Sequence, residues 1–249
     1  MILAVDIGNT NINIGSFQGK KLTSHYCIDN NSLINQKAIF PLSPSLLNQT
    51  RDILIASVNP KAETVFYKYL GKKHKKKVLK IGKEIKLQMP ILVDNPQKIG
   101  IDRVLNALAA YRRTKKPTIV IDFGTAITID IVSRKGEFLG GLILPGIRAS
   151  AYALNKQAAL LPEVDIKKPK DVIGKNVENA IRAGIYFGTT GSIIHIIRKI
   201  RKVYKDLQYT IATGGDAKTF KKDISEIDKV VPRLTLEGIR IAFTESVNP

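Results

Sequence analysis

The sequence predicts an α/β protein built from two related domains, and two short phrases carry that prediction. Asp6-Ile7-Gly8-Asn9-Thr10 and Asp122-Phe123-Gly124-Thr125 each follow an almost wholly apolar run. Each phrase is followed by an alternating segment that can return as a second strand. We therefore expect a buried strand, a tight turn and a returning strand, once in each half of the chain.

The residue types in these turns suit a phosphate group. Glycine lets the backbone come close to a ligand. Backbone N–H groups and a threonine hydroxyl can hold phosphate, and the aspartate can hold a cation or its water. A single Asp-x-Gly-x-Thr is weak evidence, because Asp-Gly turns close many hairpins. Its duplication in matching strand contexts indicates two domains that face a nucleotide across a cleft.

Length and composition are those of an ordinary globular protein. The chain has 249 residues, of which 44% are hydrophobic and 24% charged, enough for one large domain or two small ones. No apolar run approaches the roughly 20 residues that span a bilayer, and the N-terminal run reads as a strand rather than a signal peptide. The single cysteine, Cys27, permits no internal disulfide, which favours a cytoplasmic location.

The net charge of +19 is the one unusual bulk property. The basic clusters are scattered and lack the interleaved aromatic residues of a single-strand nucleic-acid surface. We therefore expect solvated loops and helix faces and no nucleic-acid partner. His25, His74 and His195 are far apart in sequence and show no zinc-ligand spacing, so a structural metal site is not expected.

Further elements follow from periodicity and turn signals. Strands are expected at 51–58, 78–81 and 208–213, an extended stretch at 87–93, and a loop in the lysine run at 72–77. Helices are expected at 61–70, 103–113, 147–160, 176–187, 192–204 and near 236–243. Lys115-Lys116-Pro117 precedes the second apolar strand, and this predicts domains at 1–115 and 116–249.

Two other segments carry possible chemistry. Thr213-Gly214-Gly215-Asp216 follows a strand, and its glycine backbone leaves room for adenosine, although Gly-Gly after a strand is often only a turn. Gly100-Ile101-Asp102-Arg103 stands at the entrance to a helix. A carboxylate and a guanidinium there can bind a small hydroxylated, carboxylated substrate, and the carboxylate can accept its hydroxyl proton. The alternative without a function is that this segment only begins a helix and that Asp102 and Arg103 form a charge pair on the surface.

Taken together, these segments make the chain resemble the type III pantothenate kinases, the Bvg accessory factor-like family of the acetate kinase, sugar kinase, Hsp70 and actin superfamily. The match is collinear from end to end. Besides the segments above it includes Asn95-Pro96, Gly140-Gly141 with Pro145-Gly146, Ala180-Ile181 with Gly184-Ile185, and Leu234-Thr235-Leu236-Glu237-Gly238.

The resemblance implies two actin-like, ribonuclease H-like domains with mixed sheets flanked by helices, and a nucleotide cleft between them. It implies ATP-dependent phosphorylation of pantothenate to 4′-phosphopantothenate, the first step of coenzyme A biosynthesis. It further implies a homodimer in the cytoplasm, Mg²⁺ with the nucleotide, and a monovalent cation such as K⁺ or ammonium.

The resemblance also assigns roles to single residues. Asp102 becomes the proton acceptor, Asp122 the ligand of the monovalent cation, and Asp6 the ligand of Mg²⁺ through water. The ATP-binding residues become Asp6, Ile7, Gly8, Asn9, Thr10, Asn11, Ile12, Asn13, Thr125, Gly214 and Gly215. The substrate-binding residues become Val93, Gly100, Ile101, Asp102, Arg103 and Val177.

Two substrate-side positions depart from the family pattern. The family has a tyrosine where this chain has Val93 and a threonine where it has Val177. Each change removes a hydroxyl that could hydrogen-bond pantothenate, and losing one such bond costs about 0.5–1.5 kcal/mol. Two alternatives follow: a kinase of another small alcohol, or a catalytically weak ATP-binding regulatory protein that contacts nucleic acid through its basic surface.

Overall fold

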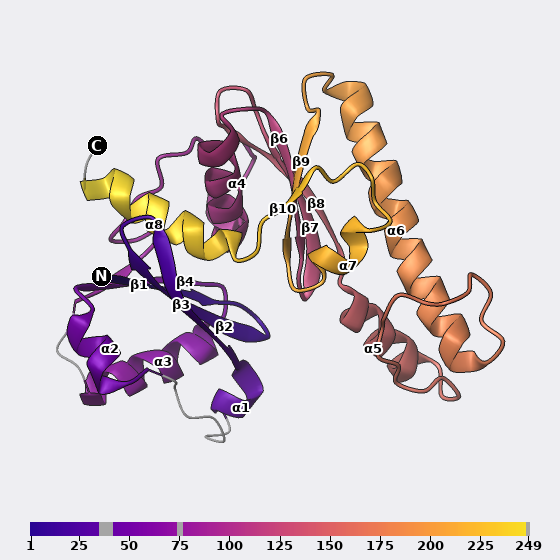
Figure 1. The fold of residues 1–249 in the computed structure, drawn as a ribbon, viewed down its shortest axis with the longest axis horizontal. Helices are drawn as coiled ribbons and strands as arrows, with labels where there is room; N and C mark the ends of the chain where they lie inside the picture. The colour runs from indigo at the N-terminus through magenta and orange to yellow at the C-terminus, as the bar shows by residue number, and fades with distance from the viewer. Residues whose placement is uncertain (35–41, 74–76, 248–249) are drawn as a thin grey trace. The chain divides into compact units, whose positions relative to one another are not determined.

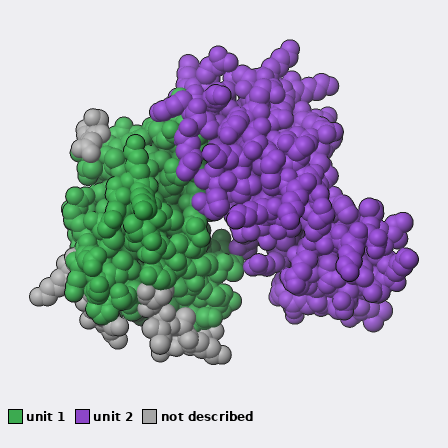
Figure 2. Space-filling view, in the orientation of Figure 1, with its two compact units in different colours: residues 1–90, 94–112, 233–249 green, residues 91–93, 113–232 purple. Residues whose placement is uncertain are grey.

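The structure is a computed structural model that describes residues 1–34, 42–73 and 77–247. Contacts divide it into two compact units (Figure 2). Unit 1 contains residues 1–90, 94–112 and 233–249, and unit 2 contains residues 91–93 and 113–232. The boundary expected at 115/116 lies close to the crossing at 112/113. The C-terminal segment, however, belongs to unit 1.

Unit 1 is built on a five-stranded mixed sheet of order β3-β2-β1-β4-β5 (Figure 1). β1 pairs antiparallel with β2 and parallel with β4. The strands are β1 (Ile2–Ile7), β2 (Asn11–Gln18), β3 (Lys21–Asp29), β4 (Asp52–Ser57) and β5 (Val78–Lys80). The helices are α1 (Asn30–Ile34), α2 (Pro44–Gln49), α3 (Pro60–Lys73), α4 (Ile101–Thr114) and α8 (Leu234–Val247).

Alternation along β1 and β2 decides which helices cover which face of this sheet. Side chains such as Val5 and Ile14 form one core with Phe66 of α3, and α1 and α2 add to that core. α4 and α8 pack closely together, because a Cβ on Gly238 would lie only 2.3 Å from the Leu105 carbonyl oxygen. Thr235 of α8 also donates to Asn106 of α4 at 2.9 Å. These contacts explain why α8 belongs to unit 1.

Unit 2 repeats the plan with a sheet of order β10-β9-β6-β7-β8. β6 takes the place of β1, with β7 and β8 antiparallel on one side and β9 and β10 parallel on the other. The strands are β6 (Thr118–Phe123), β7 (Ala126–Val132), β8 (Phe138–Pro145), β9 (Tyr209–Gly214) and β10 (Lys229–Val230). The helices are α5 (Ile147–Gln157), α6 (Val177–Val203) and α7 (Ala217–Lys221). The predicted fold class, α/β with two mixed sheets flanked by helices, is confirmed.

Two expectations need correction. Residues 176–187 and 192–204 do not form separate helices, because α6 continues through Gly188 and Gly191. The stretch expected to be extended at 87–93 contains a bridge from Ile91 to Phe138 and forms no regular strand. The loop expected in the lysine run 72–77 is partly wrong, since α3 extends to Lys73, and residues 74–76 lie outside the described residues. Among the described helices, none is both long and apolar enough to cross a membrane.

Candidate active site

The first turn lies between β1 and β2 in unit 1. The Gly8 N–H donates to the Asn11 carbonyl at 3.0 Å and closes the hairpin. A Cβ on Gly8 would lie 3.2 Å from that same oxygen, so the turn is tight around its glycine. Asp6 pairs across the strands with Asn13, whose side chain contacts His25 Nε2 at 3.2 Å. The predicted residues Asp6 to Asn13 therefore form one continuous hairpin.

Asparagines that sequence reasoning missed hold this turn from behind. Asn30 is 3% exposed, and its Nδ2 donates to the carbonyl oxygens of Gly8 at 2.8 Å and Asn9 at 3.0 Å. Its backbone N–H donates to the Thr10 carbonyl at 2.8 Å. Asn59 Nδ2 adds a longer bond of 3.4 Å to Asn9. No short-range pattern could reveal Asn30, because it follows the turn by about 20 residues.

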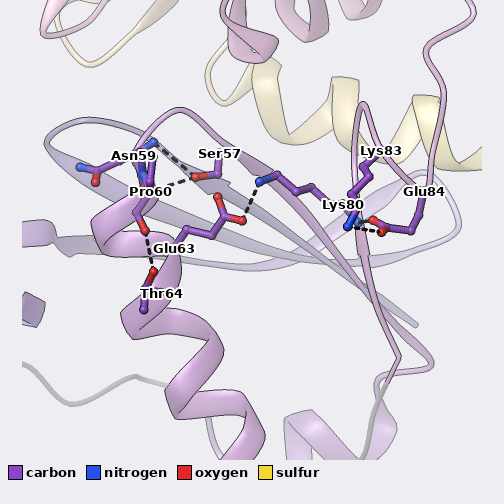
Figure 3. A network of polar contacts seen from close by, with 8 residues as sticks. All are labelled: Ser57, Asn59, Pro60, Glu63, Thr64, Lys80, Lys83 and Glu84. Atoms are coloured by element: carbon purple, nitrogen blue, oxygen red, sulfur yellow. Dashed lines mark hydrogen bonds and ion pairs between the residues drawn. The ribbon is translucent and has the colours of Figure 1, made fainter.

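Asn59 belongs to a polar network at the carboxyl end of β4 (Figure 3). Its backbone N–H donates to Ser57 Oγ at 3.3 Å, and its Oδ1 accepts from the Ala62 N–H at 3.1 Å. Lys80, at the end of β5, donates to Glu63 of α3 at 2.6 Å. These bonds fix the start of α3 against two strand ends. The Val58 N–H, bonded to the Ile7 carbonyl at 3.0 Å, ties the same segment to β1.

Asp102 stands in the first turn of α4, next to this edge of unit 1. Gly100 lies beside it, and a Cβ there would be 2.5 Å from Asp102 Oδ1 and 3.8 Å from Val58. Asp102 Oδ1 accepts a hydrogen bond from the Arg103 N–H at 2.9 Å. Burial raises the pKa of the Asp102 carboxyl above its usual value, against the opposing effect of the Arg103 N–H and charge. A carboxylate with a raised pKa is suited to accepting a proton.

The second turn lies between β6 and β7 in unit 2. The Gly124 N–H donates to the Ala126 carbonyl at 3.2 Å, as Gly8 does in the first turn. Gly146, at the start of α5, donates to the Thr125 carbonyl at 3.1 Å. A Cβ on Gly146 would lie 2.4 Å from that oxygen, so α5 begins directly against the turn.

Gly214 brings the third predicted segment to the second turn. It pairs with Phe123 across β6 and β9 and has a φ of 91°. A Cβ there would lie 2.5 Å from Asp122 Oδ1, which explains the need for glycine. Next to Gly215, which has open space where a Cβ would stand, burial raises the pKa of Asp216. Asp122, Thr125, Gly214 and Gly215 therefore gather at one edge of unit 2.

An aromatic column supports this edge. Phe123, directly after Asp122, stacks on Phe220 of α7 with ring centroids 5.0 Å apart. Tyr186 of α6 stacks on the other side of Phe220, also at 5.0 Å. The Tyr186 hydroxyl donates to Asp223 Oδ2 at 2.6 Å. The position of β6 thus depends on two helices far along the chain.

The two valines at predicted substrate positions lie in different segments of unit 2: Val93 in an irregular stretch and Val177 on α6. Val93 is half-buried, and its Cγ1 would be 3.5 Å from a Cβ on Gly140 of β8. Val177 is the first residue of α6 and 50% exposed. Asn176 caps that helix by accepting the Asn179 N–H at 2.8 Å.

Comparison with known proteins decides the family. The sequence profile described as type III pantothenate kinase matches residues 2–199. The chain belongs to the type III pantothenate kinase family. A type III pantothenate kinase of Geobacter sulfurreducens is 38% identical over 98% of both chains, and one of Citrifermentans bemidjiense is 37% identical over the same shares. The family resemblance read from the motifs is confirmed.

Solved structures agree on the fold. A Campylobacter jejuni protein assigned to the Baf family of transcriptional activators has a TM-score of 0.63 at 22% identity, with both chains fully covered. An N-acetylglucosamine kinase of Porphyromonas gingivalis has a TM-score of 0.54 at 13% identity, covering 96% of this chain and 98% of its own. At these identities the likeness shows the fold alone.

Proposed function

We propose that this chain transfers the γ-phosphoryl group of ATP to the hydroxyl of pantothenate, giving 4′-phosphopantothenate and ADP in the first step of coenzyme A biosynthesis. The observation that carries the proposal is the similarity to type III pantothenate kinases over 98% of the chain and of its relatives. The half-buried Asp102, with its raised pKa, supports it because a phosphoryl acceptor must lose a proton.

In this proposal Asp102 accepts the proton of the attacking hydroxyl. Gly100, Ile101 and Arg103 surround the substrate, and Arg103 suits its carboxylate. Val93 and Val177 provide apolar contacts where the family has hydroxyls. Phosphoryl transfer depends mainly on positioning and charge stabilisation, so these contacts affect the affinity for pantothenate more than the chemical step.

The turns are proposed to hold ATP and its cations. Asp6 to Asn13 contact the phosphates, while Thr125, Gly214 and Gly215 contact other parts of the nucleotide. No cluster of three acidic, histidine or cysteine side chains capable of holding a metal occurs in the described ranges. This fits Mg²⁺, which often binds through one carboxylate and the substrate phosphates, here Asp6 through water. The ion supplies charge neutralisation at the phosphates.

Asp122 is proposed to hold K⁺ or ammonium. The atoms around it fit a hard monovalent cation, because the Asp122 carboxylate stands beside Gly214 and near the carbonyls of the second turn. Oxygen donors of this kind suit hard cations. The cation adds positive charge near the second turn.

A homodimer is proposed from the surface of unit 2. Large apolar side chains are exposed around α5 and the start of α6, among them Tyr152 at 55%, Ile173 at 78% and Val177 at 50%. On α6 itself Gly184, Gly188 and Gly191 are exposed on one face, which lets another helix approach closely. We also propose a cytoplasmic location, in keeping with a single cysteine.

The test is ADP release from purified protein with ATP, Mg²⁺ and K⁺, with and without pantothenate. Pantothenate-dependent release that falls when Na⁺ replaces K⁺ is expected. The variant Asp102→Asn should bind ATP normally and turn over about 10²–10⁴-fold more slowly. Release with another small alcohol but not with pantothenate would contradict the substrate. Full activity of Asp102→Asn would contradict the role of the base.

A further inference from the structure

Three successive carbonyl oxygens of the first turn point to one residue. Asn30 bonds the carbonyls of Gly8, Asn9 and Thr10 through its side-chain and backbone N–H groups, at 2.8, 3.0 and 2.8 Å. It is the first residue of α1, where β3 ends, and it is 3% exposed. Both side-chain partners are acceptors, so the Nδ2 end of the amide must face the turn.

This arrangement fixes the direction of the turn's N–H groups. In a trans peptide the C=O and the N–H of one plane point in opposite directions. The carbonyls of Gly8 and Asn9 face Asn30, so the N–H groups of Asn9 and Thr10, in the same planes, face away from it. Two successive N–H groups on one side of a turn form an anion-binding concavity.

We propose that Asn30 is a positioning residue, which aims the N–H groups of Asn9 and Thr10 at the ATP phosphates by holding the carbonyls behind them. The proposal rests on the phosphate role of this turn in the proposed function. Asn30 touches no phosphate itself. It removes the freedom of the Gly8-Asn9-Thr10 peptides to rotate, so their dipoles need no reorganisation when phosphate binds.

The burial of the whole amide supports a role for its donors. Asn30 Oδ1 is buried and accepts no hydrogen bond from the described residues. An orphaned acceptor is unfavourable, and an apolar side chain of similar shape would avoid it. The two N–H bonds from the Asn30 amide to the turn are therefore what favours asparagine at this position, because an apolar side chain could not make them.

Asn59 supports the same turn from a second element. Its 3.4 Å bond reaches the Asn9 carbonyl from the loop between β4 and α3. The bond to Ser57 in Figure 3 holds its backbone, and the Ala62 N–H holds its Oδ1. The Asn9 carbonyl therefore receives N–H donors from two segments. Because the Asn59 bond is longer, its removal should matter less than that of Asn30.

The experiment measures ATP, ADP and adenosine affinity of the full chain by titration calorimetry. Asn30→Leu keeps the volume but removes the donors, and Asn30→Ala and Asn59→Ala give a graded series. Asn30→Leu should weaken ATP and ADP about ten- to hundredfold and leave adenosine unchanged. In activity assays KM for ATP should rise while KM for pantothenate stays constant. Asn59→Ala should show the same split at smaller size.

Asn155→Ala is the matched control, because Asn155 Nδ2 also donates to a backbone carbonyl, that of Leu161, at 2.9 Å in unit 2. It should leave the affinities for all three ligands unchanged. Equal weakening of ATP and adenosine in Asn30→Leu, or no weakening, would overturn the inference. If Asn30→Leu does not fold, Asn59→Ala takes its place in the test. Weaker binding of ATP and ADP with unchanged binding of adenosine would then support the inference, and any other result would overturn it.

The outcomes separate this inference from the substrate assignment. The wild-type chain could bind ATP more tightly than adenosine but release no ADP with pantothenate. That result would contradict pantothenate as the substrate and would leave the test of Asn30 valid. A wild-type chain that binds ATP no more tightly than adenosine means that the turn holds no phosphate, and this overturns the role of Asn30 directly.

Discussion

Asp102, the proposed proton acceptor, is a side chain whose ionised form is unfavourable for stability. Burial raises the pKa of its carboxyl. A raised pKa means that the folded state binds the proton more tightly than the unfolded state does. The contribution of Asp102 to the free energy of unfolding is therefore most favourable at pH values below its unfolded pKa. It is lost as the pH rises through the folded pKa.

Asp102→Asn should consequently raise the melting temperature at neutral pH while it lowers turnover. The gain in melting temperature should shrink as the pH falls toward the range in which the wild-type carboxyl is protonated. The pH profile of kcat/KM in the wild type should lose activity on the acid side, because only the ionised carboxylate accepts a proton. Thermal melts and rates across pH measure both. If the melting temperature of Asp102→Asn relative to wild type were lower at neutral pH than at acid pH, the expected effect of the raised pKa would be contradicted.

Gly214 and Gly215 form a matched pair for the second turn. Gly214→Ala forces a side chain into left-handed backbone and against Asp122 Oδ1 and the Phe123 carbonyl, so it should cost about 1–3 kcal/mol of unfolding free energy. Gly215→Ala meets open space and should change stability by less than about 0.5 kcal/mol. Chemical denaturation measures both. If adenosine lies against Gly215, Gly215→Ala should raise KM for ATP and leave the stability of the fold unchanged. Gly214→Ala should instead lower that stability.

At the level of single residues the sequence predicted the groups that carry local signals. The two Asp-x-Gly turns and the Gly100-x-Asp102-Arg103 segment could be recognised because a few adjacent residues define them. Asn30 could not, because its bonds to Gly8 and Asn9 exist only once β3 has brought it back to the turn. The partners of a turn depend on the register of neighbouring strands, which this sequence does not display.

At the level of elements, α6 shows why two helices were expected where one exists. Gly188, Thr189, Thr190 and Gly191 are poor helix formers, and each glycine costs about 1 kcal/mol relative to alanine. The flanking apolar residues Ile181, Tyr186, Ile193 and Ile197 all join one core, so packing on a single sheet face keeps the helix continuous. Tertiary contacts outweighed local propensity here.

The bond between Tyr186 and Asp223 ties α6 to the segment after α7. Tyr186→Phe should lower the unfolding free energy by about 1–3 kcal/mol, because a buried hydroxyl loses its bond to a charged group. Lys168 and Tyr186 lower the pKa of Asp223. Stabilisation of this sign is present above the unfolded pKa and is lost as the pH falls through the folded pKa.

Denaturation of Tyr186→Phe at neutral and acid pH therefore tests the pair. The penalty should be largest near neutral pH and shrink in acid, where Asp223 becomes protonated. Tyr209→Phe, a change of the same kind at the half-buried start of β9, is the control and should show no such pH dependence. A penalty for Tyr186→Phe that is constant with pH would mean that the loss comes from the other hydrogen bond of the hydroxyl, to the Thr219 carbonyl at 3.4 Å, and not from its bond to Asp223.

At the level of the whole molecule, the sequence predicted the duplicated sheet but not the return of the C-terminal helix to unit 1. The repeated strand and turn predicted two equivalent sheets, and the matching strand orders confirm this. The C-terminal helix was assigned by position to the second domain, yet α8 packs on α4 through Gly238 and belongs to unit 1. Most residues of α8 from Leu234 to Phe243 are buried, and an apolar helix of this kind does not reveal in its own sequence which of two sheets it covers.

The proposed homodimer can be tested on α6 without disturbing the chain's own packing. A Cβ on Gly184 or Gly188 meets nothing within 4 Å inside the chain. Gly184→Arg should therefore leave the fold of the single chain unchanged and block close approach of a second helix. Sedimentation or light scattering should show a dimer for wild type and a monomer for this variant, whereas Ser225→Arg, on an exposed turn of the same unit, should remain dimeric. A Gly184→Arg dimer as stable as wild type would place the interface elsewhere, since an arginine could not be accommodated between two closely packed glycine faces.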